Sequence, residues 1–273
     1  MQNFKATPAE ILASSWRNRS LIRAFVSRAI LGRYRGSYLG ILWSFVNPLI
    51  MLAVYTFVFS VVFKMRMGVD GDESRAQFAM VLFVGIIVHA LFAEVIIAAP
   101  SLILNNVNYV KKVVFPLEIL PLVSSGAALF HMLISASVLL VATLLINGFI
   151  PLTAILAPVV LVPFIVLLAG FSWLLASIGV YLRDANQVMG IVASVMLFLA
   201  PIFYPLSSVP EAYRPLIMLN PLTFIIEEAR AVLIWGRMPD WSGLLVYSVI
   251  AGVVACLGFA WFQKTRKGFA DVV

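Results

Sequence analysis

The sequence predicts an all-α integral membrane protein with six transmembrane helices. Hydrophobic residues make up 63% of its 273 residues and only 11% are charged, less than half of the roughly 25% that a soluble domain carries. Several apolar runs reach the roughly 20 residues that a helix needs to cross a bilayer. These runs are continuous and lack the alternation typical of membrane β-strands. A segment rich in arginine precedes the first run.

Six apolar runs are candidate membrane spans. The third and fourth are separated by Asn147-Gly148-Phe149-Ile150-Pro151, which is a strong signal for a tight turn. We expect one membrane domain, with a cytoplasmic amphipathic segment over 1–36, a transmembrane region over 37–262 and a cytoplasmic tail over 263–273. The candidate spans are Leu39–Phe63, Phe78–Leu104, Ile119–Ile146, Leu152–Tyr181, Val188–Tyr204 and Leu244–Phe262.

The basic residues predict the orientation of the chain. Lys and Arg are concentrated before the first span and in the C-terminal tail, and cytoplasmic loops carry such an excess. Six spans then place both termini in the cytoplasm. The net charge of +7 is explained by topology and by contact with anionic lipids, so it does not indicate nucleic-acid binding. The basic residues at the two ends are Lys5, Arg17, Arg19, Arg23, Arg28, Arg33, Arg35, Lys264, Arg266 and Lys267.

The segment before the first span predicts an amphipathic helix at the cytoplasmic interface. Thr7-Pro8-Ala9-Glu10 has the pattern of a capping box with proline at the first helical position, so a helix should begin there. Further along, the arginines lie largely off an apolar stripe, as in helices that lie in the plane of a membrane surface. This helix either anchors the topology alone or also touches a cytoplasmic partner. The stripe consists of Leu21, Ile22, Phe25, Val26, Ala29 and Ile30.

The first connection on the cytoplasmic side, Asn105–Pro116, is longer than a turn requires. Its asparagines suit a helix cap, and Pro116 ends the segment, so we expect a short amphipathic helix there. The segment is either a simple turn between two spans or a lever that docks on another subunit.

The connection on the outside, Pro205–Trp241, is too apolar for a soluble loop and is interrupted by prolines. Asn220-Pro221 is a good helix start. Short apolar helices that do not span the bilayer indicate a re-entrant pair, and irregular backbone at membrane depth is tolerated only against protein or a cavity. The competing interpretation is one ordinary span across 221–236, which would place the C-terminus outside.

The chain lacks the signatures of several enzyme classes. It contains no G-x-x-x-x-G-K-[ST], so it does not bind a nucleotide through a P-loop, and it has no H-E-x-x-H or G-x-S-x-G. Glu94 is the one clear acid within a span, and such groups are often functional. Because His89 does not share a helix face well with Glu94, we favour a structural or pore-facing Glu94 over proton coupling.

Aromatic residues are frequent around the first span. Tyr55, Phe59 and Phe63 fall on one helix face, Tyr38 lies just before the span and Trp43 lies near the interface. A ladder of aromatic faces suits sliding contact with sugar rings. The alternative is that these rings face lipid or pack between helices, as aromatic residues at membrane interfaces commonly do.

Several segments resemble one family of membrane proteins. Arg33-Tyr34-Arg35-Gly36-Ser37-Tyr38-Leu39-Gly40-Ile41-Leu42-Trp43, Asn47-Pro48-Leu49 and Tyr55-Thr56-Phe57-Val58-Phe59 are similar to the start of the permease subunit of ABC type 2 polysaccharide exporters. Tyr181-Leu182-Arg183-Asp184 and Asn220-Pro221-Leu222-Thr223 resemble the corresponding later segments. These transporters export O-antigen, capsular polysaccharide or teichoic acid, and the similarity covers nearly the whole chain.

The resemblance implies a transport subunit that is not itself an enzyme. It implies a homodimer, two copies of a separate ATPase that binds ATP and Mg, and no cofactor or metal in this chain. It also implies roles for individual residues. The coupling helix maps to Asn106, Tyr109, Lys111, Lys112 and Phe115; the gate helices, near 207–219 and 221–235, include Pro210, Asn220, Pro221 and Glu227; the channel includes Tyr38, Trp43, Tyr55 and Phe59.

We therefore expect a subunit that exports a lipid-linked polysaccharide, O-antigen first, across the bacterial inner membrane. Arg33 and Arg35 could attract the pyrophosphate of the substrate at the inner leaflet. Capsular polysaccharide and teichoic acid are alternative substrates, and a drug or a lipid is a further one. A transferase acting on lipid-linked sugars would instead need an essential Glu94 or His131. An ion-coupled carrier is disfavoured because intramembrane charge is sparse and no inverted repeat is visible.

Overall fold

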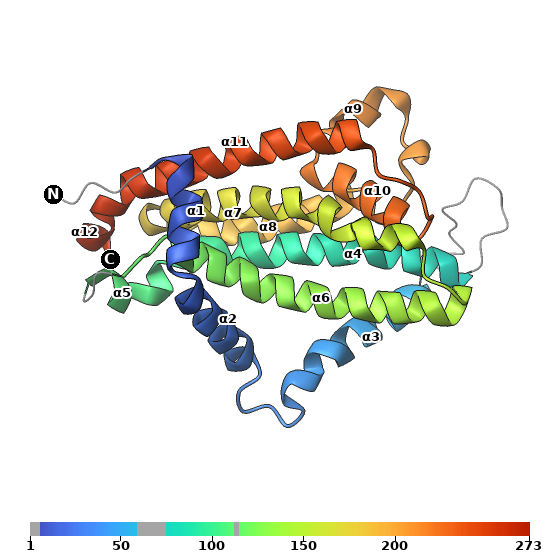
Figure 1. The fold of residues 1–273 in the computed structure, drawn as a ribbon, viewed down its shortest axis with the longest axis horizontal. Helices are drawn as coiled ribbons and strands as arrows, with labels where there is room; N and C mark the ends of the chain where they lie inside the picture. Colours follow the sequence, from blue (N-terminus) through green and yellow to red (C-terminus); the bar gives the residue numbers. More distant parts are fainter. Residues whose placement is uncertain (1–5, 59–74, 112–114) are drawn as a thin grey trace.

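The structure is a computed structural model that describes residues 6–58, 75–111 and 115–273 (Figure 1). All regular elements in these ranges are helices, which confirms the predicted fold class. The α-helices are α1 (Pro8–Arg17), α2 (Arg19–Arg33), α3 (Trp43–Tyr55), α4 (Arg75–Ala98), α5 (Val107–Lys111), α6 (Ile119–Asn147), α7 (Ala157–Tyr181), α8 (Ala185–Leu199), α9 (Arg214–Met218), α10 (Pro221–Leu233), α11 (Trp241–Thr265) and α12 (Phe269–Val272).

Five helical segments are long and apolar enough to cross a membrane, so the chain is a multi-pass membrane protein. They coincide with the first four predicted spans and the last one. The turn between the third and fourth forms at Gly148, whose φ of 78° is left-handed and ends α6. The five segments are Gly40–Val58, Ala76–Ser101, Ile119–Asn147, Leu152–Tyr181 and Trp241–Val272.

The fifth predicted span, Val188–Tyr204, forms a shorter helix than expected. Helix α8 has 15 residues, which is about 22 Å at about 1.5 Å per residue. It ends at Leu199 because Ala200 precedes Pro201, and the residue before a proline is driven out of the helical region; Ala200 has ψ 149°. Residues 201–204 therefore continue as an irregular segment after the helix.

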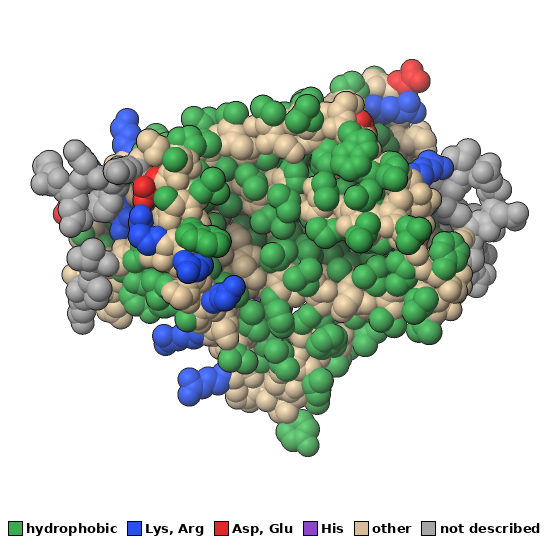
Figure 2. Space-filling view, in the orientation of Figure 1, with side chains coloured by type: hydrophobic (Ala, Val, Ile, Leu, Met, Phe, Trp, Pro, Cys, Tyr) green, Lys and Arg blue, Asp and Glu red, His purple; other side chains and the backbone are tan. Residues whose placement is uncertain are grey.

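The two ends of the helical bundle carry different elements. In Figure 1, α1, α5 and α12 lie at one end, and α9 and α10 lie at the other. Because α1 and α12 share an end, the described parts near the two termini lie on the same side of the bundle. Helix α8 is a shorter apolar helix beside the five candidate spans. On the face seen in Figure 2, Lys and Arg side chains gather near α1 and α2, whereas the middle of the face is largely apolar.

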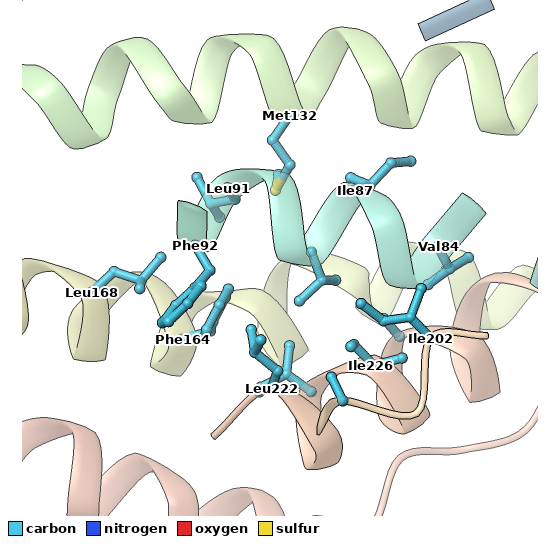
Figure 3. Packing of buried hydrophobic residues seen from close by; sticks show 14 of the residues in the cluster. Val84, Ile87, Leu91, Phe92, Met132, Phe164, Leu168, Ile202, Leu222 and Ile226 are labelled. Carbon is cyan, nitrogen blue, oxygen red and sulfur yellow. The ribbon is translucent and has the colours of Figure 1, made fainter. Parts of the chain in front are cut away.

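Helix α4 forms the centre of the bundle. Its membrane segment is 67% buried, against 6% for the segment that contains α3, because α4 is apolar on all sides. Figure 3 shows Ile87, Leu91 and Phe92 of α4 facing side chains from other helices. Their neighbours include Met132, Phe164, Leu168, Ile202, Leu222 and Ile226, which come from α6, α7, the α8–α9 connection and α10.

Glycines allow α7 to approach two other parts of the chain at backbone distance. A Cβ at Gly170 would lie 2.7 Å from the backbone of Ala255 in α11, and one at Gly258 would collide with the carbonyl oxygen of Gly170. A Cβ at Gly179 would collide with the carbonyl oxygen of Pro100. The hydrophobic effect does not drive helices together within a membrane, so their association depends on close packing. Small residues such as these glycines allow that packing.

The N-terminal segment is helical from Pro8, as predicted, but it consists of two helices that meet at Asn18. The predicted capping box does not form: the side chain of Thr7 makes no cap hydrogen bond, and Glu10 binds Arg17 at 2.9 Å instead. The apolar stripe of α2 packs against α6 and the residues around α5, so protein covers much of it. Arg23 and Arg28 remain exposed.

Candidate functional site

A polar pocket of about 510 Å³ lies between α2, α4, α6 and the segment that leads into α5. Arginines from α2 approach it from one side, and Glu94 of α4 and His131 of α6 approach it from the other. Most helix surfaces in this protein are apolar, so a pocket with several charged groups is a candidate site. Its polar lining residues are Arg28, Arg33, Glu94, Asn106, Tyr109, Ser124 and His131.

Arg33, Glu94 and His131 form a connected triad in this pocket. The Arg33 guanidinium lies 2.5 Å from Glu94 Oε1, and His131 Nδ1 lies 2.9 Å from the same oxygen. Nδ1 also lies 3.1 Å from the Arg33 guanidinium. His89, which the sequence analysis placed on a different helix face from Glu94, contacts the Ala193 carbonyl at 2.9 Å. The partner of Glu94 is His131, because α4 and α6 pack side by side.

The predicted coupling segment forms the short helix α5, which an aromatic cluster attaches to α2. The rings of Tyr109 and Phe115 stack with centroids 4.5 Å apart, and Phe25 of α2 lies 5.7 and 5.6 Å from them. The side-chain amide of Asn106 donates to the Leu102 carbonyl at 2.8 Å. Lys111 is exposed at the end of α5, and Lys112 lies outside the described residues.

A buried ion pair joins the end of the coupling segment to the C-terminal helix. Arg266 lies 2.5 Å from Glu118, with side chains only 11% and 8% exposed. Arg266 also donates to the Phe115 carbonyl at 2.6 Å, and Ser14 of α1 donates to Glu118 at 2.9 Å. Trp173 of α7 donates to the Glu118 carbonyl. The N-terminal helix, the coupling segment, α7 and the C-terminal helix thus share one polar cluster.

The predicted gate residues lie at the opposite end of the bundle. Pro210 precedes a single turn of 3-10 helix, Glu211–Tyr213, that leads into α9. Helix α10 begins as predicted: Pro221 is its first residue, and the Asn220 side chain accepts from the Leu222 amide at 2.9 Å. Helix α10 has 13 residues and packs on α4 and α7. It is too short for an ordinary span, so the alternative of one span across 221–236 is wrong.

Arg230 fixes α10 to the rest of the bundle. Its side chain is 1% exposed and donates to the carbonyls of Val81, Pro201 and Ile202 at 3.0, 2.7 and 3.0 Å. It also pairs with Glu227 at 2.8 Å. Sequence analysis identified Glu227 and missed Arg230, although a charged pair three residues apart in an apolar helix is a usable signal.

The end of the gate segment is also tied to α11. The Asp240 amide donates to Glu228 at 2.9 Å. The Asp240 carboxylate accepts from the Ser242 hydroxyl and from the Gly243 and Ser242 amides, which cap α11. These hydrogen bonds, with the hydroxyl bond as the largest cause, hold the pKa of Asp240 below its usual value. Gly236, at φ 66°, supplies the left-handed residue of the turn that precedes this cap. Helix α10 is therefore held by Arg230 within the helix and by the contact of Glu228 with Asp240 beyond its end.

Comparison with known proteins identifies the family. The model of the ABC-2 type transporter family matches residues 20–234. The chain belongs to the ABC-2 type transporter family. It is 27% identical to the O-antigen export system permease protein RfbA of Myxococcus xanthus over 93% of this chain and 96% of that protein. It is 23% identical to a protein of the same name from Klebsiella pneumoniae, over 93% and 95%. The polysialic acid transport protein KpsM of Escherichia coli is 22% identical, over 90% and 93%.

Two of the predicted channel residues of this ABC-2 type transporter, Trp43 and Tyr55, are the first and last residues of α3, which belongs to the least buried of the five candidate spans. Tyr38 is fully exposed between α2 and α3, Trp43 is 37% exposed and Tyr55 is half-buried. Phe59 lies outside the described residues. Arg35, the second residue predicted to attract a phosphate, is exposed in the same connection.

Helix α8 of the transporter carries a polar stripe that sequence analysis missed. Asn186, Gly190 and Ser194 share one helix face and, with Gln187, line a shallow hollow of about 580 Å³. Both amides and Ser194 are exposed. The Ser194 hydroxyl is satisfied by the Gly190 carbonyl, but amide side chains are costly to place in hydrocarbon. The end of this face that carries Asn186 and Gln187 therefore belongs against water or another protein surface. The spacing of four residues was a signal that could have been used.

Proposed function

We propose that this ABC-2 type transporter is the membrane subunit of an ATP-driven exporter that moves a lipid-linked polysaccharide from the cytoplasm across the bacterial inner membrane. One observation carries the proposal: permeases named for O-antigen export align with 93% of the chain. O-antigen is therefore the first candidate substrate. A capsular polysaccharide is the second, because a polysialic acid transport protein aligns over 90% of the chain. Teichoic acid is a third candidate on the same scaffold.

The pathway in this proposal forms between two copies of the chain. The span that contains α3 is only 6% buried, and α8 exposes amide and hydroxyl groups within a membrane helix. A second copy placed against these helices would enclose the polar stripe of α8, away from lipid. Aromatic residues of α3 would then offer ring faces to the sugars, and the stripe would supply hydrogen bonds.

Energy in this proposal comes from two copies of a separate ATPase, which bind ATP and Mg. The contact surface would be α5 with its exposed Lys111, on the cytoplasmic side together with both termini. The Tyr109 ring of α5 packs against Phe25 and Phe115. A displacement of α5 would therefore also move α2 and the lining of the polar pocket. At the other end, α9 and α10 would act as the gate through which the glycan leaves.

Purification of the tagged full chain from its native membrane in mild detergent tests the partnership. We expect a P-loop ATPase to copurify in equal amount, as measured by mass spectrometry and quantitative gel staining. Tyr109→Ala should lower the amount of bound ATPase, because it removes the stacked ring that holds α5, whereas Lys264→Ala, outside α5, serves as the matched control. A chain that purifies alone in several detergents would contradict the proposal. Loss of a transferase activity in Glu94→Gln or His131→Ala would then be the next test.

A further inference from the structure

In the structure, Glu94 forms an ion pair with Arg33, the arginine that an incoming anion would bind. We infer that Glu94 is an internal counter-anion, that the phosphoryl group of the lipid-linked substrate displaces it from Arg33, and that His131 holds Glu94 after the exchange. The inference rests on the proposed function, because that function supplies the lipid-linked phosphoryl group. The inference adds one feature to that function. We call the Arg33–Glu94 ion pair the latch, because the substrate itself must break it to bind.

The charges of the pocket make displacement necessary. Arg28 and Arg33 contribute positive charge, and Glu94 is the one acidic side chain among the residues that line the pocket. Glu94 lies 2.5 Å from the Arg33 guanidinium, so a phosphoryl oxygen bound to the same guanidinium nitrogen would lie against a carboxylate oxygen of like charge. Two anions this close repel strongly in a partly buried site. A phosphoryl group therefore binds this guanidinium nitrogen well only after Arg33 and Glu94 have separated.

His131 provides a second partner for Glu94. Its Nδ1 lies 2.9 Å from Oε1 and 3.2 Å from Oε2 of Glu94, and 3.1 Å from the Arg33 guanidinium. A neutral imidazole nitrogen either donates or accepts a hydrogen bond, so Nδ1 cannot serve both groups at once. With its proton on Nδ1, His131 donates to Glu94, and the carboxylate keeps a donor when Arg33 leaves. The exchange thus avoids a partly buried carboxylate without a partner.

The three side chains differ in how firmly they are held. His131 is 16% exposed, with its ring edge-on to those of Tyr34 and Phe130. Arg33 is 56% exposed and is the last residue of α2, just before the connection to α3. Its long side chain can turn toward the membrane surface, while Glu94 and His131 stay in place on α4 and α6. Arg33 is therefore the moving member of the triad.

The test measures binding to the full chain in nanodiscs of neutral phosphatidylcholine. The ligand is a long-chain polyprenyl diphosphate, compared with inorganic pyrophosphate and with phosphatidylglycerol. Glu94→Gln removes the competing charge and keeps the side-chain shape, so we expect about tenfold tighter binding of the polyprenyl diphosphate, equivalent to about 1.4 kcal/mol. Arg33→Gln should weaken binding by about tenfold or more in either background. Asp271→Asn changes the net charge equally outside the pocket and should leave the affinity unchanged.

A second pair of variants separates the latch from a structural role. His131→Phe should weaken binding when Glu94 is present, because the displaced carboxylate then has no donor. The same substitution should have little effect in the Glu94→Gln background. Equal weakening in both backgrounds would mean that His131 only supports the fold, because independent effects add, and would overturn the inference.

Three other results would overturn the latch. The first is unchanged affinity in Glu94→Gln while Arg33 is still required. The second is the absence of binding of polyprenyl diphosphate in every variant. The third is an equal response with phosphatidylglycerol, which would assign the site to membrane lipid. These results leave the export function itself open, because surface polysaccharide in cells with and without the chain reports on that function separately.

Discussion

Replacing Arg230 with methionine should lower the free energy of unfolding by about 3–5 kcal/mol. The guanidinium is 1% exposed and serves three carbonyl oxygens together with Glu227. Methionine fills part of the volume but donates nothing, and each buried carbonyl left without a donor costs about 1–3 kcal/mol. Helix α10 would lose its attachment to α4 and to the segment after α8.

Thermal unfolding of the detergent-solubilised chain measures this effect. A loss of about 3–5 kcal/mol should lower Tm by roughly 10 °C for a chain of this size. The Tm of Arg230→Lys should lie between those of the wild type and Arg230→Met. One ammonium group keeps the charge but cannot reproduce the planar set of donors that reaches all three carbonyls. Arg237→Met is the matched control: Arg237 is exposed, so its replacement should change stability by about 0.5 kcal/mol or less. Equal melting of the Arg230 and Arg237 variants would refute the assigned role.

Replacing Arg266 with methionine is the second change with a large expected effect. It leaves Glu118, which is 8% exposed, without its cation, and it removes the donor to the Phe115 carbonyl. Breaking one side of a buried pair costs about 3–5 kcal/mol. Because Phe115 stacks on Tyr109, the coupling segment should also loosen, which limited proteolysis near α5 would detect.

The double variant Arg266→Met/Glu118→Leu separates the pair from its neighbours. Without the carboxylate there is no uncompensated charge, so the double variant should be more stable than Arg266→Met alone. Arg17→Met breaks the more exposed pair with Glu10, with side chains 61% and 18% exposed, and should cost only about 0.2–1 kcal/mol. A double variant less stable than both single variants would show that Arg266 and Glu118 do not depend on each other.

The spans were predictable because the length of an apolar run is a local property of the sequence. Leu152–Tyr181 was predicted with the ends that the structure gives, and Asn220-Pro221 starts α10 through a local cap. The fifth span was predicted too long because the effect of Pro201 on the preceding residue was not weighed against the apolar run. The capping box at Thr7 was wrong in detail because Glu10 has a stronger partner in Arg17.

The charged clusters were not predictable in the same way. Arg33, Glu94 and His131 lie 61 and 37 residues apart along the chain, and only the packing of α2 and α4 on α6 brings them together. Arg230 finds its acceptors 149, 29 and 28 residues away. A single sequence shows that charged residues within a membrane are destabilising unless they are paired. The partner that stabilises each of them is determined by the tertiary structure.

Surface polysaccharide in a strain that lacks this chain tests the central claim most directly. We predict that the polysaccharide disappears from the cell surface, that its lipid-linked form accumulates inside, and that the wild-type chain restores export while Arg230→Met does not. Labelling intact cells and lysed cells with the same glycan-specific antibody separates the two pools. Normal surface polysaccharide in the deletion strain, with no internal accumulation, would contradict the account.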